Sequence, residues 1–351
     1  MSPPRSAHDR LRLAIVSTPR SGNTWVREAL GRIYDVKHFA RHIMRDGDWR
    51  ALPDECLLQI HWRCEPDFVK RLQENGFRVL VVARHPFDVL LSILHVVIYD
   101  VDSERWLNGR HGDERCLWGA MPRSRSLIDY AKSPRAVELL AVSCDWWHDP
   151  AAIRVRYEDM VANPEAEWQR LISLIGPPRG QSFAEVLAET SLERQRRYSI
   201  NNHFWKGKPG LWRELLPSAE ANEIHGSLQW CFEALGYVCD ADLTLDAAKA
   251  DANWVQLAGA ELGRALRNNS ASVRNVLDHM NAHCERVNAQ AAADRRDRDH
   301  FRDEFHRLEA HLAQFEGLTG FSLRVARAAQ RIQALVLGPA RLLKRPVRRS
   351  A

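Results

Sequence analysis

LRLAIVSTPRSGNTW, the stretch from Leu11 to Trp25, decides the fold. The apolar run Leu13 to Val16 suits a buried parallel strand, and Pro19 and Gly22 then interrupt it. Apolar residues at helical spacing follow from Thr24 to Ile33. The sequence therefore predicts a strand, a glycine-containing turn and a helix, with the turn at the helix N-terminus.

The turn has the composition of an anion-binding site. The unpaired amides of Ser21 to Trp25 can point at one anion, and the helix dipole adds a favourable field. Arg20 supplies a fixed positive charge, and Gly22 lets the backbone approach a ligand closely. A Walker A loop would need GxxxxGK[ST], which is absent, so an ordinary nucleoside triphosphatase is disfavoured. For this segment alone, a capped turn without a ligand is the competing interpretation.

A second strand followed by a helix begins at Arg78. The run Arg78 to Ala83 reads as a buried strand, Arg84 follows it, and Pro86 suits the first turn of a helix that continues to Val97. Ser92 falls further along this helix. Because ligands of open α/β sheets bind at the carboxyl ends of the strands, Arg84 and Ser92 are candidates for a second phosphate. The competing interpretation is a surface arginine and a solvated serine.

Two further segments complete the pattern. Ile153 to Tyr157 reads as a third strand, followed by Glu158, Asp159 and a helix from about Pro164. A basic loop from Phe204 to Arg213 carries two glycines and flanking aromatic residues.

The four segments together resemble one family, the sulfotransferases that use 3′-phosphoadenosine 5′-phosphosulfate. The family motifs read approximately TYPKSGTTW, RNPxDxxxS, YED and RKGxxGxWK. They are matched in order by Thr18 to Trp25, Arg84 to Ser92, Tyr157 to Asp159 and Lys206 to Arg213. The resemblance spans roughly Arg12 to Cys239, about two thirds of the chain.

The resemblance implies a three-layer α/β/α fold with a central parallel sheet and a P-loop-like phosphosulfate loop. It also implies roles for the donor-binding residues. The resemblance implies that the 5′-phosphosulfate end is bound by Arg20, Ser21, Gly22, Asn23, Thr24 and Trp25, with Trp25 close to the adenine. The 3′-phosphate falls to Arg84, Ser92, Lys206 and Gly207, and Tyr157 contacts the adenine. Glu158 and Asp159 are expected to cap or brace the next helix.

The resemblance also proposes the catalytic groups. His61 ends a short predicted strand, Cys56 to His61, and corresponds to the histidine that acts as base in many family members. Arg20 and Lys206 would balance charge on the departing phosphate oxygen, so no metal is expected. Because carbohydrate-modifying members sometimes use a carboxylate base, Glu65 and Asp67 are the alternatives.

Four positions depart from the family pattern. Arg20 and Gln59 stand where lysine is usual, Trp205 replaces an arginine and Leu211 a common aspartate. Arg20 keeps the positive charge but changes reach and hydrogen-bond geometry, and the Gln59 change removes a positive charge near the transferring group. The changes at Trp205 and Leu211 make 3′-phosphate binding more dependent on Arg84 and Ser92.

Composition fits an enzyme of the reducing cytoplasm. The 351 residues include 45% hydrophobic residues, enough for one sizeable core, and a net charge of +5 gives no argument for nucleic acid. Seven cysteines without CxxC pairs read as reduced thiols. Neither a signal peptide nor an apolar run of the ~20 residues needed for a membrane span is evident.

The domain organisation predicted is a polar tail at 1–10, a sulfotransferase domain at 11–240, a helical, coiled-coil-like extension at 241–320 and a basic amphipathic tail at 321–351. The extension suggests self-association or packing on the catalytic domain. The tail suggests peripheral attachment to the inner membrane face or a disordered segment. An irregular stretch from Asp100 to Ala136 is expected to shape the acceptor pocket.

Two function classes follow. The first is transfer of a sulfuryl group from 3′-phosphoadenosine 5′-phosphosulfate to an acceptor hydroxyl, with a carbohydrate or glycolipid acceptor favoured. The second is a P-loop-like nucleotide-binding protein or kinase that acts as an assembly module through its C-terminal helices. The missing Walker lysine and Mg²⁺-binding pattern disfavour the second class.

Overall fold

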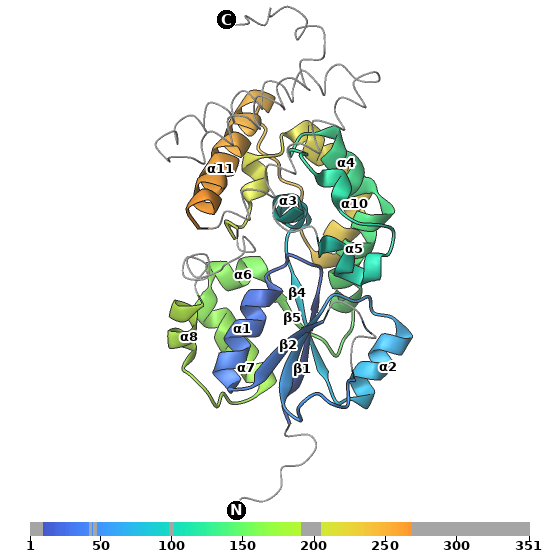
Figure 1. Ribbon diagram of the computed structural model, residues 1–351, viewed down its shortest axis with the longest axis vertical. Coiled ribbons are helices and arrows are strands. Elements are labelled where there is room, and N and C mark those ends of the chain that lie inside the picture. The colour runs from blue at the N-terminus through green and yellow to red at the C-terminus, as the bar shows by residue number, and fades with distance from the viewer. Residues whose placement is uncertain (1–9, 42–43, 45–47, 98–101, 191–204, 269–351) are drawn as a thin grey trace, which may run out of the picture.

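The centre of the fold is a five-stranded parallel sheet of order β2-β3-β1-β4-β5 (Figure 1). The computed structural model describes residues 10–41, 44, 48–97, 102–190 and 205–268. The strands are β1 (Arg12–Ser17), β2 (Lys37–Arg41), β3 (Cys56–Ile60), β4 (Arg78–Ala83) and β5 (Ile153–Arg156). The three inner strands are almost wholly buried, as their continuous apolar runs predict for a sheet covered on both faces.

Helices cover both faces of the sheet (Figure 1). One face packs against α1 (Asn23–Tyr34), α6 (Tyr157–Ala162), α7 (Pro164–Ile175) and α8 (Phe183–Glu189). The other packs against α2 (Pro66–Glu74) and α5 (Pro134–Trp147). This arrangement confirms the predicted α/β fold with a central parallel sheet.

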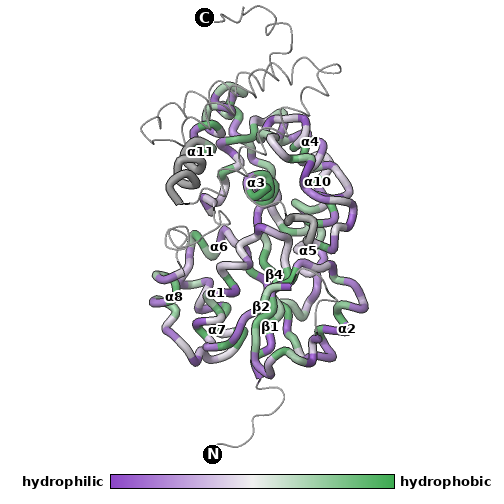
Figure 2. The backbone as a smooth tube through the Cα atoms, viewed as in Figure 1, coloured by the Kyte–Doolittle hydropathy of each residue, from purple (hydrophilic) through white to green (hydrophobic). Residues whose placement is uncertain are grey.

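A second group of helices lies beyond the carboxyl ends of the strands (Figure 1). At its centre is α3 (Pro86–Val97), in which all residues are buried and which appears almost uniformly hydrophobic in Figure 2. Figure 1 shows α4 (Arg125–Lys132), α10 (Ser218–Leu235) and α11 (Ala247–Asn268) in the same group. The short 3-10 helices η3 (Arg115–Leu117) and η4 (Leu211–Glu214) contact α3, and η2 (Asp102–Gly109) precedes η3 in the chain. These elements cover the carboxyl edge of the sheet.

The expectation of an irregular stretch from Asp100 to Ala136 was wrong for its second half. Ser124 caps α4 by accepting a hydrogen bond from the Leu127 amide, and Ser133 caps α5 through the Ala136 amide. The predicted strand at Ile153 also ends one residue early, because Tyr157 begins α6.

The helical character predicted after residue 240 is seen in α11. Trp254 of this helix is buried in the main core, edge-on to Trp205 at a ring-centroid distance of 6.1 Å. The rest of the predicted extension, the basic tail at 321–351 and residues 1–9 lie outside the described residues. Within the described part of the chain, none of the helices is both long and apolar enough to cross a membrane.

Candidate active site

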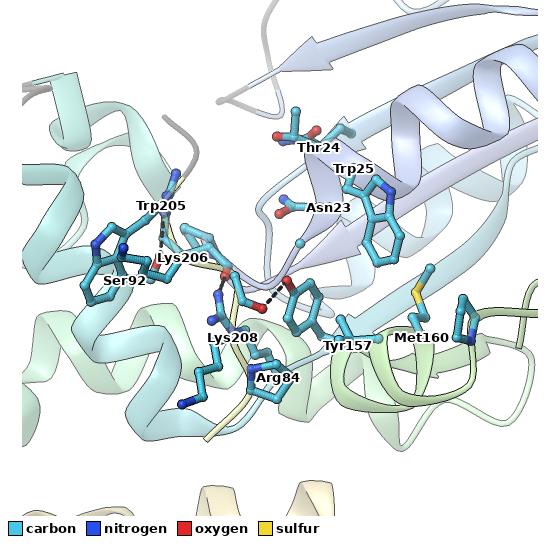
Figure 3. A pocket seen from close by; sticks show the side chains of 18 of the residues that line it. Asn23, Thr24, Trp25, Arg84, Ser92, Tyr157, Met160, Trp205, Lys206 and Lys208 are labelled. Carbon is cyan, nitrogen blue, oxygen red and sulfur yellow. Dashed lines mark hydrogen bonds between the residues drawn. The ribbon is translucent and has the colours of Figure 1, made fainter. Parts of the chain in front are cut away.

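Four predicted motifs meet where the strands end. The register pairs Val16 with Ile60, Ser17 with Val82 and Ala83 with Arg156. The residues that follow these strand ends therefore share one edge, beside the point between β1 and β4 where the strand order reverses. A cavity of about 590 Å³ opens there (Figure 3). The predicted site residues that line it are Arg20, Gly22, Asn23, Thr24, Trp25, His61, Arg84, Ser92, Tyr157, Lys206 and Gly207.

The turn after β1 is fixed to α5 by hydrogen bonds. The Thr18 amide donates to Ser143 Oγ at 2.8 Å, and the Thr18 hydroxyl donates to the Leu139 carbonyl at 2.9 Å. Ser143 Oγ in turn donates to the carbonyl of Val82 on β4 at 2.9 Å. The turn thus has a rigid base that is joined to two neighbouring strands.

Gly22 is required by both its backbone conformation and its surroundings. Its φ is +97°, and a Cβ at this position would lie 2.5 Å from Cδ2 of Tyr157. As the N-cap of α1, Gly22 gives no side-chain hydrogen bond to the first amides of the helix. The first residues of α1 line the cavity, so the N-terminus of this helix lies at the place where an anion site is expected.

Ser21 is the one predicted site residue whose side chain lies away from the cavity. It is fully buried, and its hydroxyl has no hydrogen-bond partner among the described residues. Its contribution to the turn is therefore through the backbone.

The two predicted anion-binding clusters are joined through Arg20. Arg84 Nη1 donates to the Arg20 carbonyl at 3.0 Å, and Arg20 Nε donates to Ser92 Oγ at 3.1 Å. The Arg84 guanidinium also lies 4.7 Å from the centre of the Tyr157 ring, and its buried Nε has no hydrogen-bond partner among the described residues. Both arginines consequently belong to one cavity.

Aromatic side chains line one side of the cavity. The rings of Trp25 and Tyr157 meet edge-on at 6.1 Å, and Trp25 Nε1 donates to Thr190 Oγ1 at 3.3 Å. The Tyr157 hydroxyl donates to the Gly207 carbonyl at 2.7 Å, which ties the third motif to the fourth. Burial raises the pKa of Tyr157, so its hydroxyl stays protonated in this bond. Figure 3 shows Trp25, Tyr157 and Met160 on one side of the cavity.

His61 is held in a defined orientation at the end of β3. Its side chain is 4% exposed, and its Nδ1 lies 2.7 Å from the Ser17 carbonyl oxygen. Because a carbonyl oxygen only accepts, Nδ1 carries the hydrogen and Nε2 carries the lone pair. Asn23 Nδ2 lies 3.3 Å from Nε2 and 3.4 Å from Nδ1, so the amide sits beside the ring.

The two alternative carboxylate bases do not line the cavity. Glu65 accepts hydrogen bonds from Arg110 at 3.1 Å and from Trp62 at 3.0 Å. The bond from Arg110 lowers the pKa of Glu65, and Asp67 lies exposed on α2.

Two other carboxylates brace the motifs against one another. Asp88, whose pKa is raised by burial, accepts the Gly210 amide at 2.6 Å and the Trp212 amide at 3.1 Å. Glu158 accepts the His85 amide at 2.9 Å and the Tyr237 hydroxyl at 2.6 Å. The expected bracing by Glu158 therefore acts on the second motif and on Tyr237, which corrects the prediction that it serves the next helix.

Several lining residues carry no motif signal. Trp106, Met160, Val161, Pro164 and Leu187 reach the cavity through tertiary packing alone. The Thr18–Ser143 contact joins residues 125 positions apart, so no local pattern could have revealed it. No group of three or more His, Cys, Asp or Glu within the described ranges could hold a metal ion.

The fold and the cavity define an α/β protein with a central parallel sheet and a cavity at the carboxyl ends of its strands. The family model of the sulfotransferase domain matches residues 11–229, and the chain belongs to this family. A search of curated proteins finds no match.

Solved structures give similar chains of low identity. Mouse sulfotransferase SULT7A1 complexed with PAP is 15% identical over 63% of this chain and 84% of its own, with a TM-score of 0.48. Retinol dehydratase in complex with androsterone and inactive cofactor PAP is 14% identical over 69% of this chain and 84% of its own, with a TM-score of 0.44. Neither of these scores reaches 0.5, so membership of the family rests on the domain match.

Proposed function

We propose that this chain transfers a sulfuryl group from 3′-phosphoadenosine 5′-phosphosulfate to an acceptor hydroxyl. The observation that carries the proposal is the link between Arg84, Arg20 and Ser92 within one cavity at the carboxyl edge of the sheet. This donor bears charged groups at both the 3′ and the 5′ position of its ribose. Two adjoining cationic clusters match that charge distribution, and the cavity volume is in the usual range for small-molecule sites.

The residues present fit such a donor. The amides of the turn from Arg20 to Trp25 would hold the 5′-phosphosulfate, where Gly22 allows a close approach. Arg84, Ser92, Lys206 and Gly207 would hold the 3′-phosphate, to which Arg84 Nε could donate, since it has no hydrogen-bond partner among the described residues. Trp25 and Tyr157 would contact the adenine with their rings.

His61 would act as the base. Its Nε2 would accept the hydroxyl proton while the acceptor oxygen forms a bond to sulfur and the bond from sulfur to the phosphate oxygen breaks. The Ser17 carbonyl supports this role because it keeps the hydrogen on Nδ1. Arg20 and Lys206 would stabilise the negative charge that develops on the departing phosphate, which leaves as 3′-phosphoadenosine 5′-phosphate.

The acceptor proposed is a hydroxyl on a carbohydrate or a glycolipid. Buried aromatic and amide side chains at the His61 side of the cavity support this class, since they combine apolar surface with hydrogen-bonding groups.

Ligand-induced thermal stabilisation tests the function. We expect 3′-phosphoadenosine 5′-phosphate to stabilise the protein by about 2.7 kcal/mol at a concentration of one hundred times its Kd, and ATP with Mg²⁺ to have no comparable effect. Stabilisation by ATP with Mg²⁺ alone would instead favour a nucleotide-binding protein or kinase.

A further inference from the structure

Trp106 reaches the cavity from a backbone turn in an unusual conformation. Its side chain is 9% exposed and lines the cavity. The next two residues, Leu107 and Asn108, have φ values of +51° and +55°. The left-handed conformation is unfavourable for a leucine and persists only where the surroundings impose it, as they do at many functional sites.

A buried ion pair imposes this conformation. Arg135, which is 2% exposed, donates to the carbonyls of Trp106 at 3.0 Å and Arg110 at 2.9 Å. It pairs with the fully buried Glu114 at 2.7 Å, and Glu114 also accepts the Tyr130 hydroxyl at 3.2 Å. One guanidinium therefore fixes both ends of the turn 106–110.

The same turn lies against the residues that follow the proposed base. The Arg110 guanidinium is 4.7 Å from the ring centre of Trp62, and Arg110 and Trp62 both donate to Glu65. Trp62 directly follows His61. The turn that carries Trp106 is thus linked to the segment that follows His61, and Trp106 and His61 line the same cavity.

Gln59 presents a polar group with no partner among the described residues on this side. It lies two residues before His61 on β3, so both side chains leave the same face of the sheet. Gln59 is 7% exposed and lines the cavity, and it is its buried Oε1 that lacks a hydrogen-bond partner within the described ranges. Because an unpaired buried acceptor is unfavourable, a hydrogen-bond donor on a bound molecule would stabilise the site by pairing with Gln59 Oε1.

We propose that Trp106, Gln59 and His61 form an acceptor subsite for a hydroxyl-bearing sugar ring, an inference that rests on the proposed sulfuryl transfer. The apolar face of the ring packs on the Trp106 indole. One hydroxyl reaches His61 Nε2, and a second hydroxyl of the same ring donates to Gln59 Oε1. An open-chain alcohol leaves the indole without a contact, and a ring with a single hydroxyl leaves Gln59 unpaired.

The experiment uses the full chain, the radiolabelled sulfuryl donor and a glycan and glycolipid extract. The labelled product is cleaved at its glycosidic bonds, and we expect the label on a released monosaccharide. Trp106→Ala should lower the labelling rate about 10- to 200-fold, with a smaller loss for Trp106→Phe, and Gln59→Leu should lower it at least about tenfold. Trp118→Ala is the matched control, because Trp118 is half-buried in the same segment and does not line the cavity.

Affinity for 3′-phosphoadenosine 5′-phosphate separates the acceptor subsite from the donor site. All four variants should bind this product within about twofold of the wild-type Kd. Each of three results would overturn the subsite. The label is found on a molecule without a sugar ring, Trp106→Ala and Trp118→Ala label at equal rates, or Gln59→Leu binds the product more weakly than the wild-type protein. If the wild-type protein labels nothing, the proposed function itself fails, whereas labelling that is insensitive to these substitutions defeats only the subsite.

Discussion

Replacement of Gly22 by alanine should remove donor binding and lower stability more than an ordinary glycine substitution. An L-residue at φ +97° costs about 1–2 kcal/mol. The new Cβ would lie 2.5 Å from Cδ2 of Tyr157, and overpacking of this kind costs about 1–3 kcal/mol. The Tyr157 ring cannot yield freely, because its hydroxyl is bonded to Gly207 and the Arg84 guanidinium lies over it. The total expected loss is about 2–5 kcal/mol.

Gly76→Ala is the matched control for this substitution. Gly76 has φ +68°, and a Cβ added there would meet none of the described residues within 4 Å, so the conformational cost of about 1–2 kcal/mol applies. At roughly 2–4 °C per kcal/mol for a domain of this size, Gly22→Ala should melt several degrees below Gly76→Ala in differential scanning fluorimetry. Only Gly76→Ala should keep the thermal shift caused by 3′-phosphoadenosine 5′-phosphate. Equal melting temperatures together with equal ligand shifts would refute the close-approach argument.

Three other substitutions test separate parts of the account. His61→Asn should reduce turnover by about 10² to 10⁴ and leave product binding nearly intact in calorimetry, and undiminished turnover would assign the base elsewhere. Burial lowers the pKa of His85 to about 4 from 6.5, so its contribution to stability is present above pH 6.5 and is lost as the pH falls towards 4, by up to roughly 3 kcal/mol. Urea unfolding at several pH values should show a weaker acid loss for His85→Asn than for wild type, and an unchanged pH dependence would contradict this. Glu114→Gln removes the carboxylate that pairs with the buried Arg135, and it should lower the free energy of unfolding by about 3–5 kcal/mol in urea unfolding. The double variant Glu114→Gln, Arg135→Met should recover part of that loss. Failure of the double variant to recover any stability would count against the desolvation argument.

The sheet and its edge were predictable because their signals are local. The apolar run Arg78 to Ala83 became β4 with the same limits, since a strand buried on both faces needs uninterrupted apolar residues. Arg84 follows that strand in the sequence, so its place at the carboxyl edge follows from the parallel topology.

The acceptor side of the cavity was not predictable in the same way. The Trp106 turn depends on the Glu114–Arg135 pair, whose partners are 21 residues apart and show no periodicity. The α4 helix was missed although Ser124 and the buried Leu127, Ile128 and Tyr130 give a cap and a helical spacing, because arginines, glycines and a proline dominate the preceding segment. Long-range hydrogen bonds thus determine the conformation of this segment, which its local composition does not reveal.

The most direct test of the central claim is calorimetric comparison of 3′-phosphoadenosine 5′-phosphate with adenosine 5′-phosphate. If Arg84 and Ser92 bind the 3′-phosphate while the turn at Arg20 binds the 5′-phosphate, removal of the 3′-phosphate should weaken binding by at least about tenfold, since charge-assisted hydrogen bonds are worth about 1.5–3 kcal/mol each. Arg84→Met should weaken the binding of the bisphosphate more than the binding of the monophosphate. Equal affinities of the wild-type protein for the two nucleotides would contradict the claim that both clusters hold one donor.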